Sequence, residues 1–245
     1  MYASKLLLFV TAAVSASPLG SIVQERSDND LAARAAPKFY SGPYTSFPGK
    51  NTWKSFDALW KANVPSMKAK GDTASDVDRI KSALQSVGKQ HNIEPRVLLA
   101  IMMQESHGDV GAKTTISQPD GLSTGGLFQC WNCPGFNGKH GLTQQQITSM
   151  VEGGAKHFQE NLAHRGGCME PKCVYPALRE YNSGANAVNL NNLSDAPNAT
   201  PSYVSDVVQR LGAGSTKCLR PPRRGVSMAS GSAFSWWKAA RRIYM

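Results

Sequence analysis

Glu105 is a carboxyl-bearing residue whose position in the sequence suits acid–base chemistry. It follows the most apolar run of the chain, residues 97–103, and shares a helical face with Leu98, Ile101 and Met102. Partial burial on that face favours the neutral form of a carboxyl group and raises its pKa. Such a group can protonate a departing glycosidic oxygen as a general acid. From position alone, a helix-terminal Glu that simply reaches water is the better interpretation, so other motifs must support the chemical one.

Three short motifs supply that support. Residues 105–108 read Glu-Ser-His-Gly, residues 126–129 read Gly-Leu-Phe-Gln after a Gly-rich loop, and residues 181–184 read Tyr-Asn-Ser-Gly. In this order and spacing they resemble the catalytic domain shared by soluble lytic transglycosylases and goose-type lysozymes. The patterns of that family are a helix ending in Glu-Ser, a Gly-Leu-Met-Gln segment and an Ala-Tyr-Asn-Ala-Gly segment. Each motif alone is a weak signal; the resemblance covers residues 76–213.

The resemblance implies a mainly α, lysozyme-like helical fold in which Glu105 protonates the β-1,4 bond between N-acetylmuramic acid and N-acetylglucosamine of peptidoglycan. It implies that Gln129 and the backbone of Gly126 to Phe128 line the sugar groove. Tyr181 would hydrogen-bond near the catalytic carboxyl, and Asn182 would hold its loop or the sugar, although Asn-Ser-Gly is also good turn chemistry. The implied substrate-binding residues are Ser106, Gly126, Phe128, Gln129, Tyr181 and Asn182.

The mechanism that the resemblance implies needs one carboxyl group instead of the usual two. In soluble lytic transglycosylases, the Glu protonates the leaving oxygen and then deprotonates the muramic 6-hydroxyl, which closes a 1,6-anhydro ring. Goose-type lysozymes deliver water instead, and both outcomes stay open here, with the motifs favouring the transglycosylase. Asp109 and Asp120 are the nearby carboxylates, and neither matches a catalytic position of the family. A chitin- or chitosan-cleaving glycosidase and a non-catalytic, secreted glycan-binding protein are the alternatives.

The sequence departs from the family pattern around the second motif. Phe128 replaces Met, and Ser183 stands where Ala is typical. Residues 130–134 read Cys-Trp-Asn-Cys-Pro, where the family often has an apolar Met-Pro-x-Thr segment. A disulfide there would stiffen a loop that lines the groove, and Trp131 would either offer a flat surface to a sugar ring or pack under the loop.

The cysteines indicate an oxidising compartment. Four of them form two tight pairs, which predict two disulfides of undetermined connectivity in preference to a four-thiolate zinc site: Cys130, Cys133, Cys168 and Cys173. Asn192 and Asn198 begin N-glycosylation sequons, which are consistent with export. The sequence therefore predicts a secreted, extracellular protein.

No cofactor and no metal is expected. The five histidines, His91, His107, His140, His157 and His164, show no spacing suited to a zinc site with three or four ligands. The chain also lacks a Gly-x-Gly-x-x-Gly motif and a phosphate-binding loop, which argues against nucleotide chemistry.

The charge of the chain is concentrated at its end. The formal net charge is +10, yet residues 37–218 hold 18 Lys and Arg against 14 Asp and Glu. Residues 219–245 are basic without any acidic residue and predict a disordered tail or an artefact of the gene model. A mildly basic body suits an anionic polymer such as a bacterial wall, whereas nucleic-acid binding would rest on charge alone. We expect a monomer that binds peptidoglycan or a related polysaccharide, without nucleic acid and without stable membrane insertion.

The segments before the catalytic domain read as export and lead-in sequences. Residues 1–16 combine Lys5, a short apolar stretch and a small-residue cleavage site, which predicts a signal peptide. Residues 17–37 are expected to form a leader or pro-segment. Residues 38–75 are expected to form an irregular lead-in with one short helix capped by Ser55.

Helices dominate the expected catalytic domain, residues 76–218. Ser75-x-x-Asp78 and Thr143-x-x-Gln146 read as capping boxes that open two helices. Pro95 suits the first turn of the buried helix that carries Glu105. Another helix is expected from near Pro201 to Gly212, and a loop-rich, disulfide-stapled segment covers residues 108–142 beside the active-site groove.

Overall fold

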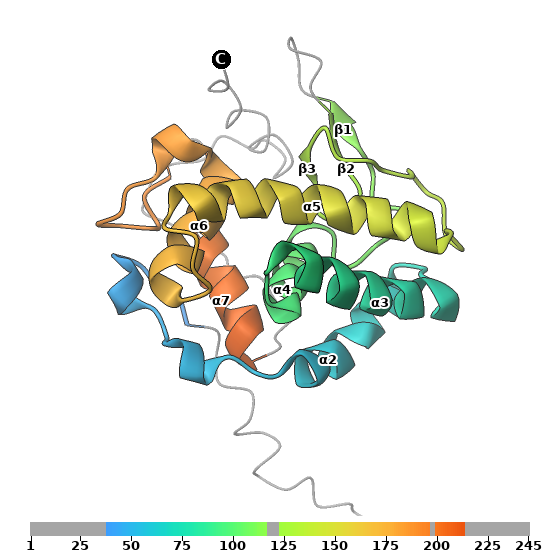
Figure 1. The fold of residues 1–245 in the computed structure, drawn as a ribbon, viewed down its shortest axis with the longest axis horizontal. Coiled ribbons are helices and arrows are strands. Elements are labelled where there is room, and N and C mark those ends of the chain that lie inside the picture. The colour runs from blue at the N-terminus through green and yellow to red at the C-terminus, as the bar shows by residue number, and fades with distance from the viewer. Residues whose placement is uncertain (1–37, 117–122, 197–198, 214–245) are drawn as a thin grey trace, which may run out of the picture. The chain divides into compact units, whose positions relative to one another are not determined.

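The computed structural model describes residues 38–116, 123–196 and 199–213, which all belong to one compact unit. Helices form most of it, so the predicted mainly α class is confirmed (Figure 1). The elements are η1 (Tyr44–Ser46), η2 (Lys50–Thr52), α2 (Phe56–Ala69), α3 (Ala74–His91), α4 (Pro95–Glu105), β1 (Thr115–Ile116), β2 (Ser123–Gly125), β3 (Cys130–Trp131), α5 (Gln144–His164), α6 (Pro171–Ser183), η3 (Ala185–Ala187) and α7 (Tyr203–Ala213).

Helix α4 is the buried centre of the helical packing. It packs against α2, α3 and α7, and every residue from Val97 to Met103 is buried. A helix that is apolar on all sides must be covered on all sides, which is the arrangement predicted from its sequence. Pro95 occupies the first turn, where its missing N–H leaves no helical hydrogen bond unmade. Glu105 is the last residue of α4, so the core holds the helix that carries it.

Helices α3 and α5 pack along one another, and α5 continues across to α6 (Figure 1). The predicted capping box of α5 is confirmed, because the side chains of Thr143 and Gln146 each accept a hydrogen bond from the other residue's backbone N–H. The predicted start of α3 is wrong by two residues. Its capping box is formed by Thr73 and Asp76 instead of by Ser75 and Asp78.

The reason for this shift lies outside the helix. Asp76 is fully buried, and its carboxylate also accepts hydrogen bonds from the backbone N–H groups of Gly141 (2.7 Å) and Leu142 (2.8 Å). Asp78 is exposed. Both tetrapeptides satisfy the local pattern, and the tertiary hydrogen bonds select the one whose carboxylate faces the protein interior.

A small antiparallel sheet occupies the segment between α4 and α5. Its strand order is β1-β2-β3, with Thr124 of β2 opposite Thr115 of β1 and Trp131 of β3. These strands are two or three residues long, which explains why strand patterns in the sequence are sparse. The sheet leads directly into residues 126–129, the second motif, and so fixes where that motif lies.

The lead-in packs into the same core. Ser55 caps α2 as predicted, since its Oγ accepts a hydrogen bond from Ala58 N–H at 3.3 Å. Upstream, the backbone N–H of Lys38 donates to Gln209 Oε1 at 2.9 Å, and that of Lys54 donates to Leu211 O at 2.8 Å. The start of the described chain therefore lies along α7, whose bounds agree with the helix expected from near Pro201.

The predicted signal peptide, leader and basic tail lie outside the described residues, as does Asn198. Within the residues that the structure describes, no helix combines the length and the apolar character needed to cross a bilayer.

Candidate active site around Glu105

The side chain of Glu105 is held at the end of α4 by a hydrogen bond from α7. Tyr203 Oη donates to Glu105 Oε1 at 2.5 Å. One residue upstream, Gln104 Oε1 accepts a hydrogen bond from Arg210 Nε at 2.9 Å, so two consecutive residues of α4 bind α7. Glu105 itself is partly exposed, in contrast to the buried residues that precede it. The arrangement presents one anchored carboxyl group between the protein interior and solvent.

Tyr203 is a buried phenol that keeps its proton. Its residue is 3% exposed, and burial together with the nearby charge of Glu105 raises its pKa well above the ordinary value. It therefore acts as an O–H donor throughout the neutral range. Sequence reasoning missed this residue, because a Tyr at the start of an amphipathic helix reads as a core aromatic. Its place beside the apolar stripe of Val204, Val207 and Val208 was the only available signal.

The surroundings of His107 are positively charged. Burial, followed by the charges of Arg210 and Lys70, lowers the pKa of His107 below its ordinary value. His107 is therefore neutral at pH 7, although it follows Glu105 by only two positions.

Ser106 connects the helix end to the second motif. Its Oγ donates to Leu127 O at 2.8 Å and accepts from Gly108 N–H at 3.1 Å. Ser106 is buried, so the structure gives it a role in joining two segments of the site. The Glu-Ser pair thus places the carboxyl group and fixes the neighbouring loop at the same time.

The second motif forms a tight turn of which only Gln129 reaches the surface. Gly126, Leu127 and Phe128 are buried, whereas Gln129 is partly exposed. Gln129 adopts a positive φ of 43°, and its Nε2 donates to Gly126 O at 2.9 Å. Residues 126–128, which were expected to line the sugar groove, are buried. Gln129 is the member of the second motif that solvent can reach.

Phe128 is accommodated by a glycine of α5. The ring is fully buried, and a Cβ atom on Gly154 would lie 2.1 Å from Phe128 Cγ. Only a residue without a side chain leaves room there. The buried ring of Phe128 is therefore matched by a glycine on the facing helix.

Tyr181 and Asn182 of the third motif lie on the other side of the site. The ring of Tyr181 stacks on that of Tyr203, with centroids 6.4 Å apart and an interplanar angle of 14°. Its hydroxyl donates to Phe128 O at 2.7 Å. The third motif thus packs against Tyr203, the residue that donates a hydrogen bond to Glu105.

Asn182 holds a loop. Its Oδ1 accepts hydrogen bonds from Thr200 N–H at 3.0 Å and from the guanidinium group of Arg179, which is fully buried. These contacts place the side chain of Asn182 beside the entry to α7. Asn182 thereby helps to position Tyr203.

Both predicted disulfides are confirmed, each within one tight pair: Cys130–Cys133 and Cys168–Cys173. The first closes a turn around Trp131, whose residue is 49% exposed. A large part of its ring is thus open to solvent directly after the second motif. Asn192 is partly exposed, and its Oδ1 accepts hydrogen bonds from the N–H groups of Gly42 and Ser194.

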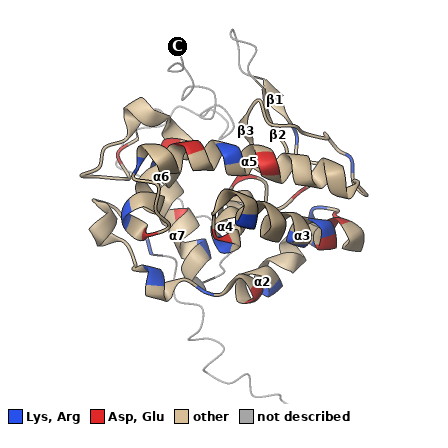
Figure 2. Ribbon diagram, viewed as in Figure 1, with Lys and Arg blue, Asp and Glu red and all other residues tan. Residues whose placement is uncertain are grey.

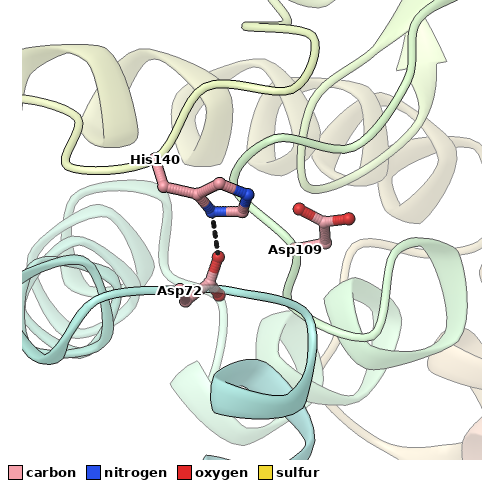
Figure 3. A group of neighbouring side chains, drawn as sticks. All are labelled: Asp72, Asp109 and His140. Atoms are coloured by element: carbon pink, nitrogen blue, oxygen red, sulfur yellow. Dashed lines mark hydrogen bonds and ion pairs between the residues drawn. The ribbon is translucent and has the colours of Figure 1, made fainter.

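Asp109, considered as a second carboxylate, belongs to another cluster. Figure 3 shows it beside Asp72 and His140. Burial, together with the charge of Asp109, raises the pKa of Asp72 to about 6 against the opposing hydrogen bond from Val110. Sequence reasoning missed this cluster, because its three residues come from distant segments. Asp120 lies outside the described residues.

No protein-family model matches the chain, and a search of curated proteins finds no match either.

Proposed function

We propose that this chain is a secreted enzyme that cleaves the β-1,4 bond between N-acetylmuramic acid and N-acetylglucosamine in peptidoglycan, on a lysozyme-like helical fold. The observation that carries the proposal is the hydrogen bond between Tyr203 and Glu105 at the end of a buried helix. It holds a partly exposed carboxyl group next to two segments whose sequences resemble the sugar-binding motifs of soluble lytic transglycosylases and goose-type lysozymes.

Glu105 would act as both acid and base. Its proton passes to the glycosidic oxygen as the bond to the leaving sugar breaks. The carboxylate that results then removes a proton from the acceptor hydroxyl. If that hydroxyl is the C6 group of the muramic residue, a 1,6-anhydro ring closes; if it is water, the product is a reducing sugar. The motif resemblance favours the first outcome.

The neighbouring residues support this role. The neutral phenol of Tyr203 donates to one oxygen of the carboxyl group and holds that group at the end of α4. Gln129 is the member of the second motif that reaches the surface, and Trp131 exposes an aromatic face two positions later. Aromatic faces are suited to packing against the apolar faces of sugar rings. The two disulfides are compatible with secretion.

The experiment compares the wild-type protein with Glu105→Gln on purified peptidoglycan, with products weighed by mass spectrometry. Glu160→Gln is the matched control, because it makes the same change at an exposed position of α5. We expect soluble muropeptides from the wild type and the control, and a loss on the order of 100-fold or more in Glu105→Gln, as general acid–base catalysis contributes about 10²–10⁴-fold.

The products distinguish a lytic transglycosylase from a lysozyme, and both from the alternative functions. A fragment one water lighter than the hydrolytic product identifies a transglycosylase, and a hydrated fragment identifies a lysozyme. Release of sugars from chitin or chitosan but not from peptidoglycan would transfer the activity to those polymers. If the folded protein pellets with peptidoglycan but releases no fragments, the chain is a glycan-binding protein and not an enzyme that cleaves peptidoglycan.

A further inference from the structure

Three side chains from three separate turns meet on one side of the described unit (Figure 3). Asp72 lies in the turn between α2 and α3, Asp109 follows α4, and His140 precedes α5. One ligand-type atom of each residue lies within 4.8 Å of the other two. A donor set of two carboxylates and one imidazole is a combination that divalent transition metals bind.

One carboxylate oxygen of Asp72, a member of this cluster, has no hydrogen-bond donor among the described residues. Its side chain is fully buried, and its Oδ1 accepts a hydrogen bond from Val110 N–H at 3.1 Å and lies 3.3 Å from His140 Nδ1. Its Oδ2 is buried and has no hydrogen-bond partner among the described residues. A buried carboxylate oxygen without a donor is costly, and a cation is one way to compensate it. This observation is independent of the clustering itself.

The backbone around the cluster holds the other two residues close to Asp72. Asp109 Oδ1 accepts from Gly111 N–H at 2.8 Å, which orients its carboxyl group. The ring of His140 lies against Gly71, where a Cβ atom would be 3.2 Å from His140 Nε2. Gly71 also has a φ of +101°, a conformation that favours glycine. The close approach of the imidazole ring therefore depends on this residue.

From these contacts we infer that Asp72, Asp109 and His140 form a binding site for a divalent cation of the zinc class. Zinc lies about 2.0–2.2 Å from nitrogen and oxygen ligands in a tetrahedral arrangement, so two ligand atoms of one ion are roughly 3.3–3.6 Å apart. The three ligand atoms lie within 4.8 Å of one another, and any pair wider than the tetrahedral spacing must draw together when the ion binds. His140, whose side chain is 30% exposed, has room to make that movement.

The ion would add to the hydrogen bonds that already link three turns of the chain. It would join the turn before α3, the turn after α4 and the loop before α5. Asp109 follows Glu105 by four positions, so the ion would brace the segment that leaves the candidate active site. The proposed role is structural, and it does not depend on the proposed glycosidase activity.

The test uses the full chain after treatment with EDTA and dialysis, titrated with ZnCl2 by calorimetry and followed by thermal unfolding. We expect binding of one zinc ion and a rise in Tm. Asp109→Asn and His140→Gln should each weaken zinc binding by at least about tenfold, since changes around metal sites commonly cost 10–100-fold in affinity. Both residues are at least partly exposed, so both variants should fold; Asp72→Asn serves as a third variant.

His91→Gln is the matched control. His91 also contacts a carboxylate, with Nε2 3.0 Å from Glu152 Oε2, but it does not belong to the three-residue cluster. Its substitution should leave zinc affinity unchanged. A folded wild-type protein that binds no zinc at neutral pH would overturn the inference, as would unchanged affinity in both cluster variants. Binding of Ca²⁺ in preference to Zn²⁺ would contradict the assignment of His140 as a ligand, because Ca²⁺ takes oxygen ligands.

Discussion

Tyr203 is the residue through which α7 reaches the carboxyl group of Glu105. Its hydroxyl stabilises the carboxylate form, so Tyr203→Phe should let the acid form persist to higher pH. We expect the alkaline limb of the pH–rate profile on peptidoglycan to move upward. We also expect kcat to fall by about 10- to 100-fold, because a hydrogen bond to a charged group is worth about 1.5–3 kcal/mol.

Tyr175→Phe provides the comparison for this prediction. Tyr175 is a fully buried phenol whose hydroxyl donates to Pro48 O at 2.6 Å and accepts from Trp53 Nε1 at 2.9 Å. Removing this hydroxyl should lower stability without moving the pH profile. An identical profile and rate in Tyr203→Phe and the wild type would remove Tyr203 from the mechanism.

Residue types in the sequence were informative where the relevant neighbours are local. Glu105 was selected as a candidate because the apolar face of its own helix and three short motifs, each readable within a few residues, pointed to it together. Tyr203 and the Asp72 cluster could not be selected, because their partners lie on other elements and helix periodicity relates only residues a few positions apart. Three-dimensional packing creates these contacts, and no pattern within one segment encodes them.

Asp76 joins the start of α3 to the loop before α5. Burial opposes ionisation of its carboxyl group, but hydrogen bonds from Gly141, Thr73 and Leu142 outweigh burial and lower its pKa below the ordinary value of 3.8. A depressed carboxyl pKa contributes stability that is present above the unfolded value and lost as pH falls through the folded value. Asp76→Asn should therefore destabilise the protein at pH 7, by about 1–3 kcal/mol.

Urea denaturation at pH 7 and at pH 3 measures both parts of this prediction. The wild type should lose stability between the two pH values, and Asp76→Asn should lose less of it. Asp78→Asn is the control, because Asp78 is exposed in the same helical turn. Equal stability of Asp76→Asn and the wild type at pH 7 would contradict the assigned role of these hydrogen bonds.

Element boundaries followed from sequence wherever one local signal stood alone. Ser55 and the Thr143 capping box marked their helices correctly, because these cap residues bind their own first turns. Pro95 marked the start of α4, because a proline suits the first turn of a helix. The start of α3 was misplaced where two capping patterns competed and a tertiary contact decided between them. The short strands escaped prediction, because two or three residues are too few to display alternation.

The charge balance differs between the body, residues 37–218, and the tail, residues 219–245. Figure 2 shows basic and acidic segments interspersed over the described helices. Residues 219–245 contribute six basic residues and no acidic one, so deleting them lowers the formal net charge from +10 to +4. If the protein binds double-stranded DNA through charge alone, deletion should abolish that salt-sensitive binding, since it depends on the number of phosphates that basic residues neutralise.

Peptidoglycan cleavage should survive the same deletion, because every residue assigned to the site precedes residue 214. Fluorescence anisotropy with labelled DNA at two salt concentrations measures the first expectation, and muropeptide release measures the second. DNA affinity that is unchanged by the deletion would locate nucleic-acid binding on the helical body and would revive it as a function.

The bond between Glu105 and Tyr203 also has a consequence for timing. A chain is synthesised from its N-terminus, so the helix that carries Glu105 emerges 98 residues before its phenol partner. The backbone N–H groups of Lys38 and Lys54 likewise have their acceptors, Gln209 and Leu211, on α7 and therefore far later in the chain. A nascent or truncated chain that lacks α7 thus holds a carboxyl group without the hydroxyl that positions it. The candidate site is therefore complete only when α7 has packed against α4.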